Sequence, residues 1–198
     1  MAFNDFSAIP DSVKQVVKGA HQIDLGVKFY KVPSDYYEWS LEQRMQVLEA
    51  PSTSHLCKTV IFANTKWDPQ LKVPFDRRNA KFYCLIVQYI DRLHSQKLNN
   101  FVKSLGANSE VERSKKYFNI RVCDEQLATE LTGYQKGGVS PLGMLADIPI
   151  IVTKNIAELD PPVVYLGAGH NDFKVSFNIN EFRVKTNCLV ADLAYEQQ

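Results

Sequence analysis

The sequence feature that most constrains this chain is a glycine-rich stretch over residues 133–143, Gly-Tyr-Gln-Lys-Gly-Gly-Val-Ser-Pro-Leu-Gly. Glycine permits backbone angles and close approaches that a side chain forbids, and proline fixes one backbone angle and lacks an N–H donor. The backbone of this stretch is therefore closely specified. Taken alone, the stretch is typical of a tight connection between two elements, with Gly133 ending a helix. The other interpretation is a backbone surface that holds a polar group of a substrate.

The composition is that of one globular domain without a strong electrostatic bias. The chain has 198 residues, 45% of them hydrophobic and 23% charged, and a net charge of +1. This length can bury one sizeable core, and a site for a polyanion must be local because the net charge attracts none. The apolar runs are too short to span a bilayer, and the N-terminus lacks the features of a secretory or transit signal. We therefore expect a cytoplasmic protein that binds neither membrane nor DNA.

Four cysteines and four histidines are scattered through the chain. No two cysteines have the short spacing of a zinc site, so the sequence predicts no metal, no cofactor and no disulfide framework. Cys57 and Cys84 lie in apolar runs, where a thiol usually behaves as a small hydrophobic side chain.

Helices and strands are predicted in an irregular mixture. One helix begins after Ser40, which can form a capping box with Gln43. The run over 81–90 is almost continuously apolar, which is typical of a central strand covered on both faces. The predicted helices span 11–20, 40–50, about 98–105 before Gly106, a segment between Asp124 and Gly133, and 179–185 after Asn178. The predicted strands span 25–32, 55–62, 81–90, 117–122, 148–153, 163–168 and 173–177, with 187–195 as an edge strand or a short helix.

These elements predict a single α+β domain over residues 1–198, built on a mixed and strongly curved sheet. Its core spans about 11–195, and 64–80 is a long insertion of a kind that is often functional or flexible. The strand over 173–177 alternates between apolar residues and the polar Lys174 and Ser176.

Lys58 stands out because strand alternation places it on one face with Leu56, Val60 and Phe62. A buried ammonium group is costly unless it is paired. One interpretation is that this end of the face lies near solvent, with the lysine stem packed and its ammonium in water. The other is that Lys58 points into a pocket and awaits an anion or a carbonyl group.

Three common motifs are absent. The glycine-rich stretch has Val139 and Ser140 where a P-loop has lysine followed by serine or threonine. The segment from Gly167 begins like a dinucleotide-binding fingerprint but lacks its third glycine and the helix that should follow. No Gly-x-Ser-x-Gly elbow of a serine hydrolase occurs.

The region 91–121 is locally basic, which fits either a phosphate-contacting patch or an ordinary solvated face.

Several segments, taken together and in order, resemble those of the YbaK-type aminoacyl-tRNA deacylases, also called prolyl-tRNA synthetase-associated editing domains. The resemblance covers roughly residues 11–195, and 64–80 fits least well. It rests on the segments 57–61, 104–106, 131–134, 137–143, 148–149 and 164–169.

This resemblance implies a compact, barrel-like domain with helices around a curved mixed sheet and one pocket. It implies hydrolysis of the ester that joins a wrong small amino acid to the 3′ end of a tRNA, with an aminoacyl-tRNA synthetase as a possible partner. The family's lysine corresponds to Lys58, and its Gly-x-x-x-Pro loop begins at Gly137. The resemblance thus assigns catalytic roles to these two residues. It assigns substrate binding to Gly138, Val139, Ser140, Pro141, Gly167 and Gly169.

The residues agree with that chemistry. An aminoacyl ester is already activated, so a fixed glycine loop can position the carbonyl and water and stabilise charge on oxygen without a strong nucleophile. Lys58 can hold a phosphate or the ester end by a charge-assisted hydrogen bond. Cys57 leaves the Lys58 face and is expected in the core rather than as a nucleophile. Cys57, Lys174 and the insertion also motivate an alternative, a non-catalytic module that binds the tRNA end or a synthetase complex.

Overall fold

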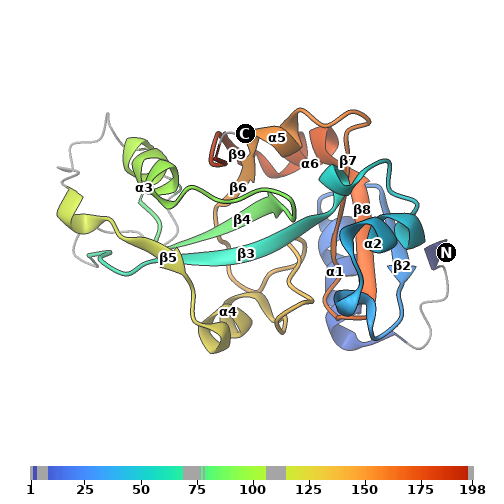
Figure 1. The fold of residues 1–198 in the computed structure, drawn as a ribbon. Coiled ribbons are helices and arrows are strands. Elements are labelled where there is room, and N and C mark those ends of the chain that lie inside the picture. Colours follow the sequence, from blue (N-terminus) through green and yellow to red (C-terminus); the bar gives the residue numbers. More distant parts are fainter. Residues whose placement is uncertain (1, 4–8, 69–76, 78, 106–114, 196–198) are drawn as a thin grey trace.

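The computed structural model describes residues 2–3, 9–68, 77, 79–105 and 115–195, and this part of the chain forms two β-sheets with helices packed around them (Figure 1). The strands are β1 (Ala2–Phe3), β2 (Val27–Lys31), β3 (Cys57–Asn64), β4 (Phe82–Gln88), β5 (Ile120–Val122), β6 (Ile150–Thr153), β7 (Val163–Gly167), β8 (Phe173–Asn178) and β9 (Leu189–Ala191). The helices are α1 (Asp11–Gln22), α2 (Leu41–Leu48), α3 (Ser95–Ser104), α4 (Glu125–Thr132), α5 (Lys154–Ala157) and α6 (Ile179–Thr186). Short 3₁₀ helices lie at Tyr36–Glu38, Thr53–His55 and Lys115–Tyr117.

The strands form an antiparallel sheet and a mixed sheet. The antiparallel sheet has the order β1-β2-β8-β7, and the mixed sheet has the order β5-β3-β4-β6-β9. In the mixed sheet β3 is antiparallel to β4 and β5, whereas β6 is parallel to β4 and β9. An isolated bridge between Leu56 and Tyr165 joins the two sheets. The α+β prediction is confirmed, whereas the expectation of a curved, barrel-like sheet is not confirmed. The described strands do not close into a barrel, because β3 and β7 pair at this bridge alone.

Local sequence signals set the ends of three helices. At α2 the Ser40 hydroxyl accepts from the Gln43 N–H at 3.2 Å, and the Gln43 side chain accepts from the Ser40 N–H at 2.9 Å. The Asp124 carboxylate caps α4, and Gly133 ends that helix with a φ of +79°. The Asn178 side chain caps α6. Each of these caps was predicted, because a cap satisfies end groups of the helix through residues that are close in sequence.

The predictions for strands β4 and β8 differ in their outcome. All seven residues of β4 are buried, and β4 lies between β3 and β6, so the prediction of a central strand is confirmed. The alternating pattern at β8 suggested one polar face, yet Lys174 and Ser176 are only 3% and 4% exposed. The reason is that β8 lies between β2 and β7, and Tyr30 and Tyr36 contact these two polar side chains.

Some boundaries were not predicted. The four-residue helix α5 was missed, and β5 is shorter than expected because a 3₁₀ helix ending at Tyr117 precedes it. The tail contributes β9, an edge strand parallel to β6. Gly106 and much of the 64–80 insertion lie outside the described residues.

The buried face of α1 packs in one core cluster with residues of the antiparallel sheet. Val13, Val16 and Ala20 recur at helical spacing, are fully buried and pack in one cluster with Val164 and Phe177 of the antiparallel sheet. Full burial of such a valine side chain contributes roughly 1.5–3 kcal/mol relative to leaving it in water.

Within the described part of the chain, no helix is long and apolar enough to cross a membrane.

Candidate functional site

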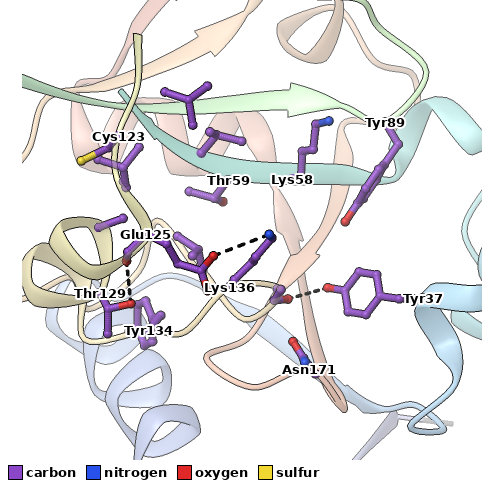
Figure 2. A pocket seen from close by; sticks show the side chains of 17 residues that line it. Tyr37, Lys58, Thr59, Tyr89, Cys123, Glu125, Thr129, Tyr134, Lys136 and Asn171 are labelled. Atoms are coloured by element: carbon purple, nitrogen blue, oxygen red, sulfur yellow. Dashed lines mark hydrogen bonds and ion pairs between the residues drawn. The ribbon is translucent and has the colours of Figure 1, made fainter. Parts of the chain in front are cut away.

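A cavity of about 650 Å³ is bounded by β3, α4, the glycine-rich loop and the end of β7 (Figure 2). Residues from other segments also line it, among them Tyr37 in the first 3₁₀ helix, Tyr89 after β4 and Asn171 after β7. Small and aliphatic residues such as Val60, Ala128 and Val139 form much of its wall. Its size suits a small ligand group, because ligand cavities usually span about 300–1,000 Å³.

The residues predicted for the site divide into two groups. Lys58, Gly137, Val139 and Gly167 line the cavity. The cavity wall does not include the remaining four residues, Gly138, Ser140, Pro141 and Gly169.

Two of these remaining residues brace the wall from behind. The Gly169 N–H donates to the Gly138 carbonyl at 2.7 Å, and a Cβ atom at Gly138 would lie 2.7 Å from the Gly169 carbonyl carbon. Glycine at position 138 therefore lets two loops touch backbone to backbone. Ser140 is fully buried, and its Oγ accepts from the Leu142 N–H at 3.3 Å, so its hydroxyl fits the turn. Pro141 lines a different hollow, which also includes Gly19.

Lys58 is a half-buried cation on the cavity wall. Its ammonium lies 5.5 Å from the centre of the Tyr89 ring. Among the residues that the structure describes, none forms a hydrogen bond or an ion pair with this ammonium. Lys136, another cation of the wall, differs because it lies 3.5 Å from the Glu125 carboxylate (Figure 2). Lys58 therefore remains available to an anionic ligand.

A chain of hydrogen bonds fixes the loop at Gly137. The Tyr37 hydroxyl donates to the Gly137 carbonyl at 2.5 Å (Figure 2), and the Lys174 ammonium donates to the Tyr37 oxygen at 3.0 Å. Lys174 also donates to the Asn171 carbonyl at 2.7 Å. Gly137 has a φ of +85°, and a Cβ atom there would lie 2.1 Å from the Asn171 side-chain oxygen. Position 137 thus requires glycine. The direction of its carbonyl is fixed by the hydrogen bond from Tyr37, which Lys174 contacts in turn.

The environment of Lys174 is unusual for a lysine. Its ammonium lies 4.9 Å and 4.5 Å from the ring centres of Tyr36 and Tyr37. Burial lowers the pKa of Lys174 to about 7, and the charge of Arg44 acts in the same direction, whereas Asp172 opposes it. A fraction of Lys174 is therefore neutral near pH 7.

Sequence reasoning missed Tyr37, Tyr89 and Asn171 at the cavity. Tyr37 lies in a 3₁₀ helix of three residues, and Tyr89 and Asn171 lie outside the regular elements, so hydrophobic periodicity gives no signal for any of them. Lys174, which contacts Tyr37, did give a sequence signal, because it interrupts a strand with apolar residues on either side.

Thr59 and Cys57 are two further side chains of β3 with little exposure to solvent. Thr59 lines the cavity, and its buried hydroxyl has no hydrogen-bond partner among the described residues. Cys57 is 2% exposed and belongs to the main core cluster, and burial raises the pKa of its thiol. The expectation of a core thiol at Cys57 is confirmed. The described residues contain no group of three or more His, Cys, Asp or Glu side chains that could hold a metal ion.

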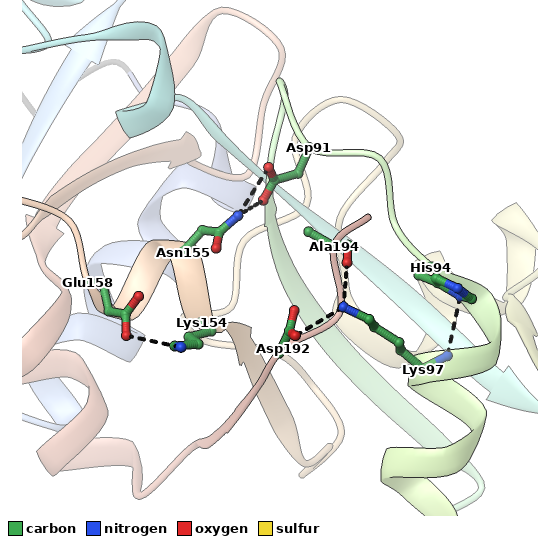
Figure 3. A network of polar contacts seen from close by, with 8 residues as sticks. All are labelled: Asp91, His94, Lys97, Lys154, Asn155, Glu158, Asp192 and Ala194. Carbon is green, nitrogen blue, oxygen red and sulfur yellow. Dashed lines mark hydrogen bonds and ion pairs between the residues drawn. The ribbon is translucent and has the colours of Figure 1, made fainter. Parts of the chain in front are cut away.

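A second hollow, beside α5 and β9, has its charges paired internally (Figure 3). Lys97, part of the basic region, donates to the Asp192 carboxylate at 3.0 Å and to the Ala194 carbonyl at 2.9 Å. Lys154 lies 3.6 Å from Glu158. These contacts favour the interpretation of Lys97 as part of a solvated face over that of a phosphate contact.

The fold encloses a cavity whose wall carries Lys58 and a fixed glycine loop, and sequence comparison identifies the family. A model of the aminoacyl-tRNA editing domain matches residues 45–184. The chain belongs to this family, as its resemblance to the YbaK-type deacylases predicted. A comparison with curated proteins found no match.

Solved structures share the fold at low sequence identity. A candidate trans-editing enzyme for prolyl-tRNA synthetase is 19% identical with a TM-score of 0.72, over 96% of this chain and 100% of that one. A protein from a study of epitope backbone grafting by computational design is 18% identical with a TM-score of 0.71, over the same shares of both chains.

Proposed function

We propose that this protein is a cytoplasmic hydrolase that removes a mischarged small amino acid from tRNA in trans by cleaving the aminoacyl ester. The observation that carries the proposal is that Lys58 and the fixed Gly137 backbone line the same cavity, and that the Lys58 ammonium has no hydrogen-bond or ion-pair partner among the described residues. Membership of the aminoacyl-tRNA editing domain family and the similarity in fold to a candidate trans-editing enzyme support it.

In the proposed reaction, water adds to the ester carbonyl carbon, and the bond from that carbon to the ribose oxygen breaks. The Gly137 carbonyl has a second lone pair besides the one that Tyr37 occupies, so it can orient the attacking water. The neighbouring ribose hydroxyl shares in proton transfer to the leaving oxygen. Lys58 holds a phosphate of the tRNA end by a charge-assisted hydrogen bond.

Hydrolysis of mischarged tRNA compensates for the limited ability of a synthetase to distinguish similar amino acids. A synthetic site separates similar small side chains by only about 1–3 kcal/mol, so a second site that hydrolyses wrong products improves accuracy. The small cavity can act as that second sieve, and it supports cysteine, alanine, serine or threonine as the amino acid removed. A prolyl-tRNA synthetase or a complex containing it is the proposed source of the mischarged tRNA.

A deacylation panel tests the proposal. tRNAs mischarged with each of these four amino acids are incubated with the protein, and release of the labelled amino acid is followed. At least one should be released, and Lys58→Ala should lower kcat/KM by about 10- to 100-fold, because a hydrogen bond to a charged group contributes about 1.5–3 kcal/mol. Lys154→Ala removes an exposed cation from the second hollow and serves as the matched control.

The alternative binding module gives a different result in the same panel. Tight binding of tRNA or of a synthetase, with no release of any of the four amino acids, would contradict the hydrolase and favour that module.

A further inference from the structure

One edge of β3 has a gap in its strand pairing. On that edge the bridge to β7 lies at Leu56, and pairing with β5 begins at Phe62. Between them, Lys58–Val60 pair with no strand on this side among the described residues, although they pair fully with β4 on the other side. The same three residues line the cavity. The floor of the cavity is therefore an open strand edge.

The direction of each backbone group follows from the observed hydrogen bonds. The Tyr89 N–H donates to the Leu56 carbonyl at 3.0 Å, and the Asn64 N–H donates to the Lys81 carbonyl at 2.7 Å, so even-numbered residues of β3 face β4. The Cys123 N–H donates to the Ile61 carbonyl at 2.8 Å, so odd-numbered residues face the other way. Because this direction alternates along an antiparallel strand, the N–H and C=O of Thr59 face the gap.

We propose that the main chain of Thr59 binds the aminoacyl group of the substrate as if that group were a one-residue antiparallel strand. An extended amino acid presents its nitrogen and its carbonyl oxygen on one side, as a strand residue does. Its α-ammonium donates to the Thr59 C=O, and its ester carbonyl accepts from the Thr59 N–H. This inference rests on the proposed function and extends it, because the N–H would also stabilise the oxyanion that forms during hydrolysis.

The register decides where the rest of the substrate goes. The bound aminoacyl group continues the antiparallel pairing of Cys123 with Ile61 by two positions. Its ester end then points toward the Lys58 end of β3, where the ribose and phosphate belong. Its side chain shares the face of the Thr59 side chain, which Figure 2 shows leaving β3 opposite to Lys58.

The register also defines a substrate class. A group attached to the α-nitrogen would run back toward Cys123 and Asp124, whose backbone already occupies the next positions along the edge. The site therefore takes aminoacyl esters with a free α-ammonium and rejects N-acylated aminoacyl and peptidyl esters. This selection would leave peptidyl-tRNA intact.

Amide hydrogen exchange, measured by NMR on the full chain, tests the pairing without relying on turnover. In the free protein, the Thr59 amide should exchange at least about tenfold faster than the Lys58 and Val60 amides, because the Thr59 N–H faces the gap and the other two face β4. Since Lys58 and Val60 donate toward β4, they are internal controls. Millimolar 3′-(L-alanylamino)-3′-deoxyadenosine, which cannot be hydrolysed as an ester, should slow exchange at Thr59, and its N-acetyl derivative should not.

The contrary results are distinct from a failure of the proposed function. Slow exchange at Thr59 in the free protein, no binding of the analogue at millimolar concentration, or binding that leaves Thr59 unchanged would each overturn the inference. Protection of Thr59 without deacylation of any mischarged tRNA would retain the inference and reject the hydrolase. Thr59→Val keeps both main-chain groups, so it should still discriminate between the alanyl and N-acetylalanyl analogues. Equal binding of the two analogues would count against the register.

Discussion

At the scale of single residues, the direction of the Gly137 carbonyl depends on groups outside the cavity wall. Tyr37 donates to that carbonyl, and Lys174 and the loop at Asn171 hold Tyr37 and Gly137 in turn. Burial raises the pKa of the Tyr37 hydroxyl, so it remains a donor at neutral pH. Tyr37 is thus a positioning residue for the water that the carbonyl is proposed to orient.

Tyr37→Phe tests this positioning role, because phenylalanine keeps the ring and loses the hydroxyl. We expect kcat for deacylation to fall by about three- to tenfold with little change in KM, since one net hydrogen bond is worth about 0.5–1.5 kcal/mol. Steady-state kinetics on the best mischarged tRNA give both constants. Tyr165→Phe loses a hydroxyl that donates to the backbone carbonyl of Glu49, and it is the matched control. Equal losses in both variants would argue against a specific role.

At the scale of elements, the sequence was most informative where the structure is local. The caps at Ser40, Asp124 and Asn178 act on backbone groups two or three residues away, so sequence spacing is enough to find them. The division into two sheets was not predictable in the same way. The division depends on the fact that β3 and β7 meet only at the bridge between Leu56 and Tyr165. The apolar pattern of a strand does not identify the strand it pairs with. The helix α5 has four residues, which is too few to establish a period.

The contact of α1 with the glycine-rich loop is close enough to require glycine in the helix. A Cβ atom at Gly19 would lie 2.2 Å from the Gly143 nitrogen and 2.5 Å from its Cα. Gly19→Ala should therefore destabilise the protein by about 1–3 kcal/mol through overpacking, although alanine is favoured by about 1 kcal/mol in an open helix. Urea unfolding measures the change.

Gly26→Ala is the matched control for this contact. The nearest atom to a Cβ at Gly26 is a Glu181 carboxylate oxygen at 3.9 Å, so this change should alter stability by less than about 0.5 kcal/mol. A Gly19→Ala protein as stable as Gly26→Ala would show that the loop can move away from α1.

At the scale of the whole molecule, the buried Lys174 should make stability depend on pH. Its pKa is about 7 in the folded protein and 10.5 in an unfolded chain. Between these values the unfolded state binds more protons, so stability should rise with pH from about 7, by at most about 1.4 kcal/mol per pH unit. Below pH 7 the folded protein carries the full cost of a buried ammonium.

Lys174→Met should remove this rise, because methionine fills similar space without a charge. The free energy of unfolding of both proteins, measured in urea from pH 6 to 9, should show the wild-type protein gaining stability relative to the variant. Shared titrations of cysteine and tyrosine cancel in the difference. The exposed substitution Lys154→Met should leave the wild-type slope intact. Parallel curves for wild type and Lys174→Met would contradict a lowered pKa.

The candidate site itself was only partly predictable. Lys58 and Gly137 were found because one interrupts an apolar face and the other belongs to a glycine-rich motif. Tyr37, Tyr89 and Asn171 reach the cavity through the packing of separate segments, which no local pattern encodes. The hydrogen bonds from Lys174 to Tyr37 and Asn171 likewise depend on the pairing of β8 between β2 and β7.

The hydrogen-bond chain from Lys174 through Tyr37 to Gly137 has a consequence for synthesis of the protein. It joins residues 137 positions apart in the chain. During translation, the loop can therefore take its final shape only after β8 has left the ribosome and joined the antiparallel sheet. A prematurely terminated product that lacks β8 also lacks Lys174, so its Tyr37 loses the hydrogen bond from that ammonium.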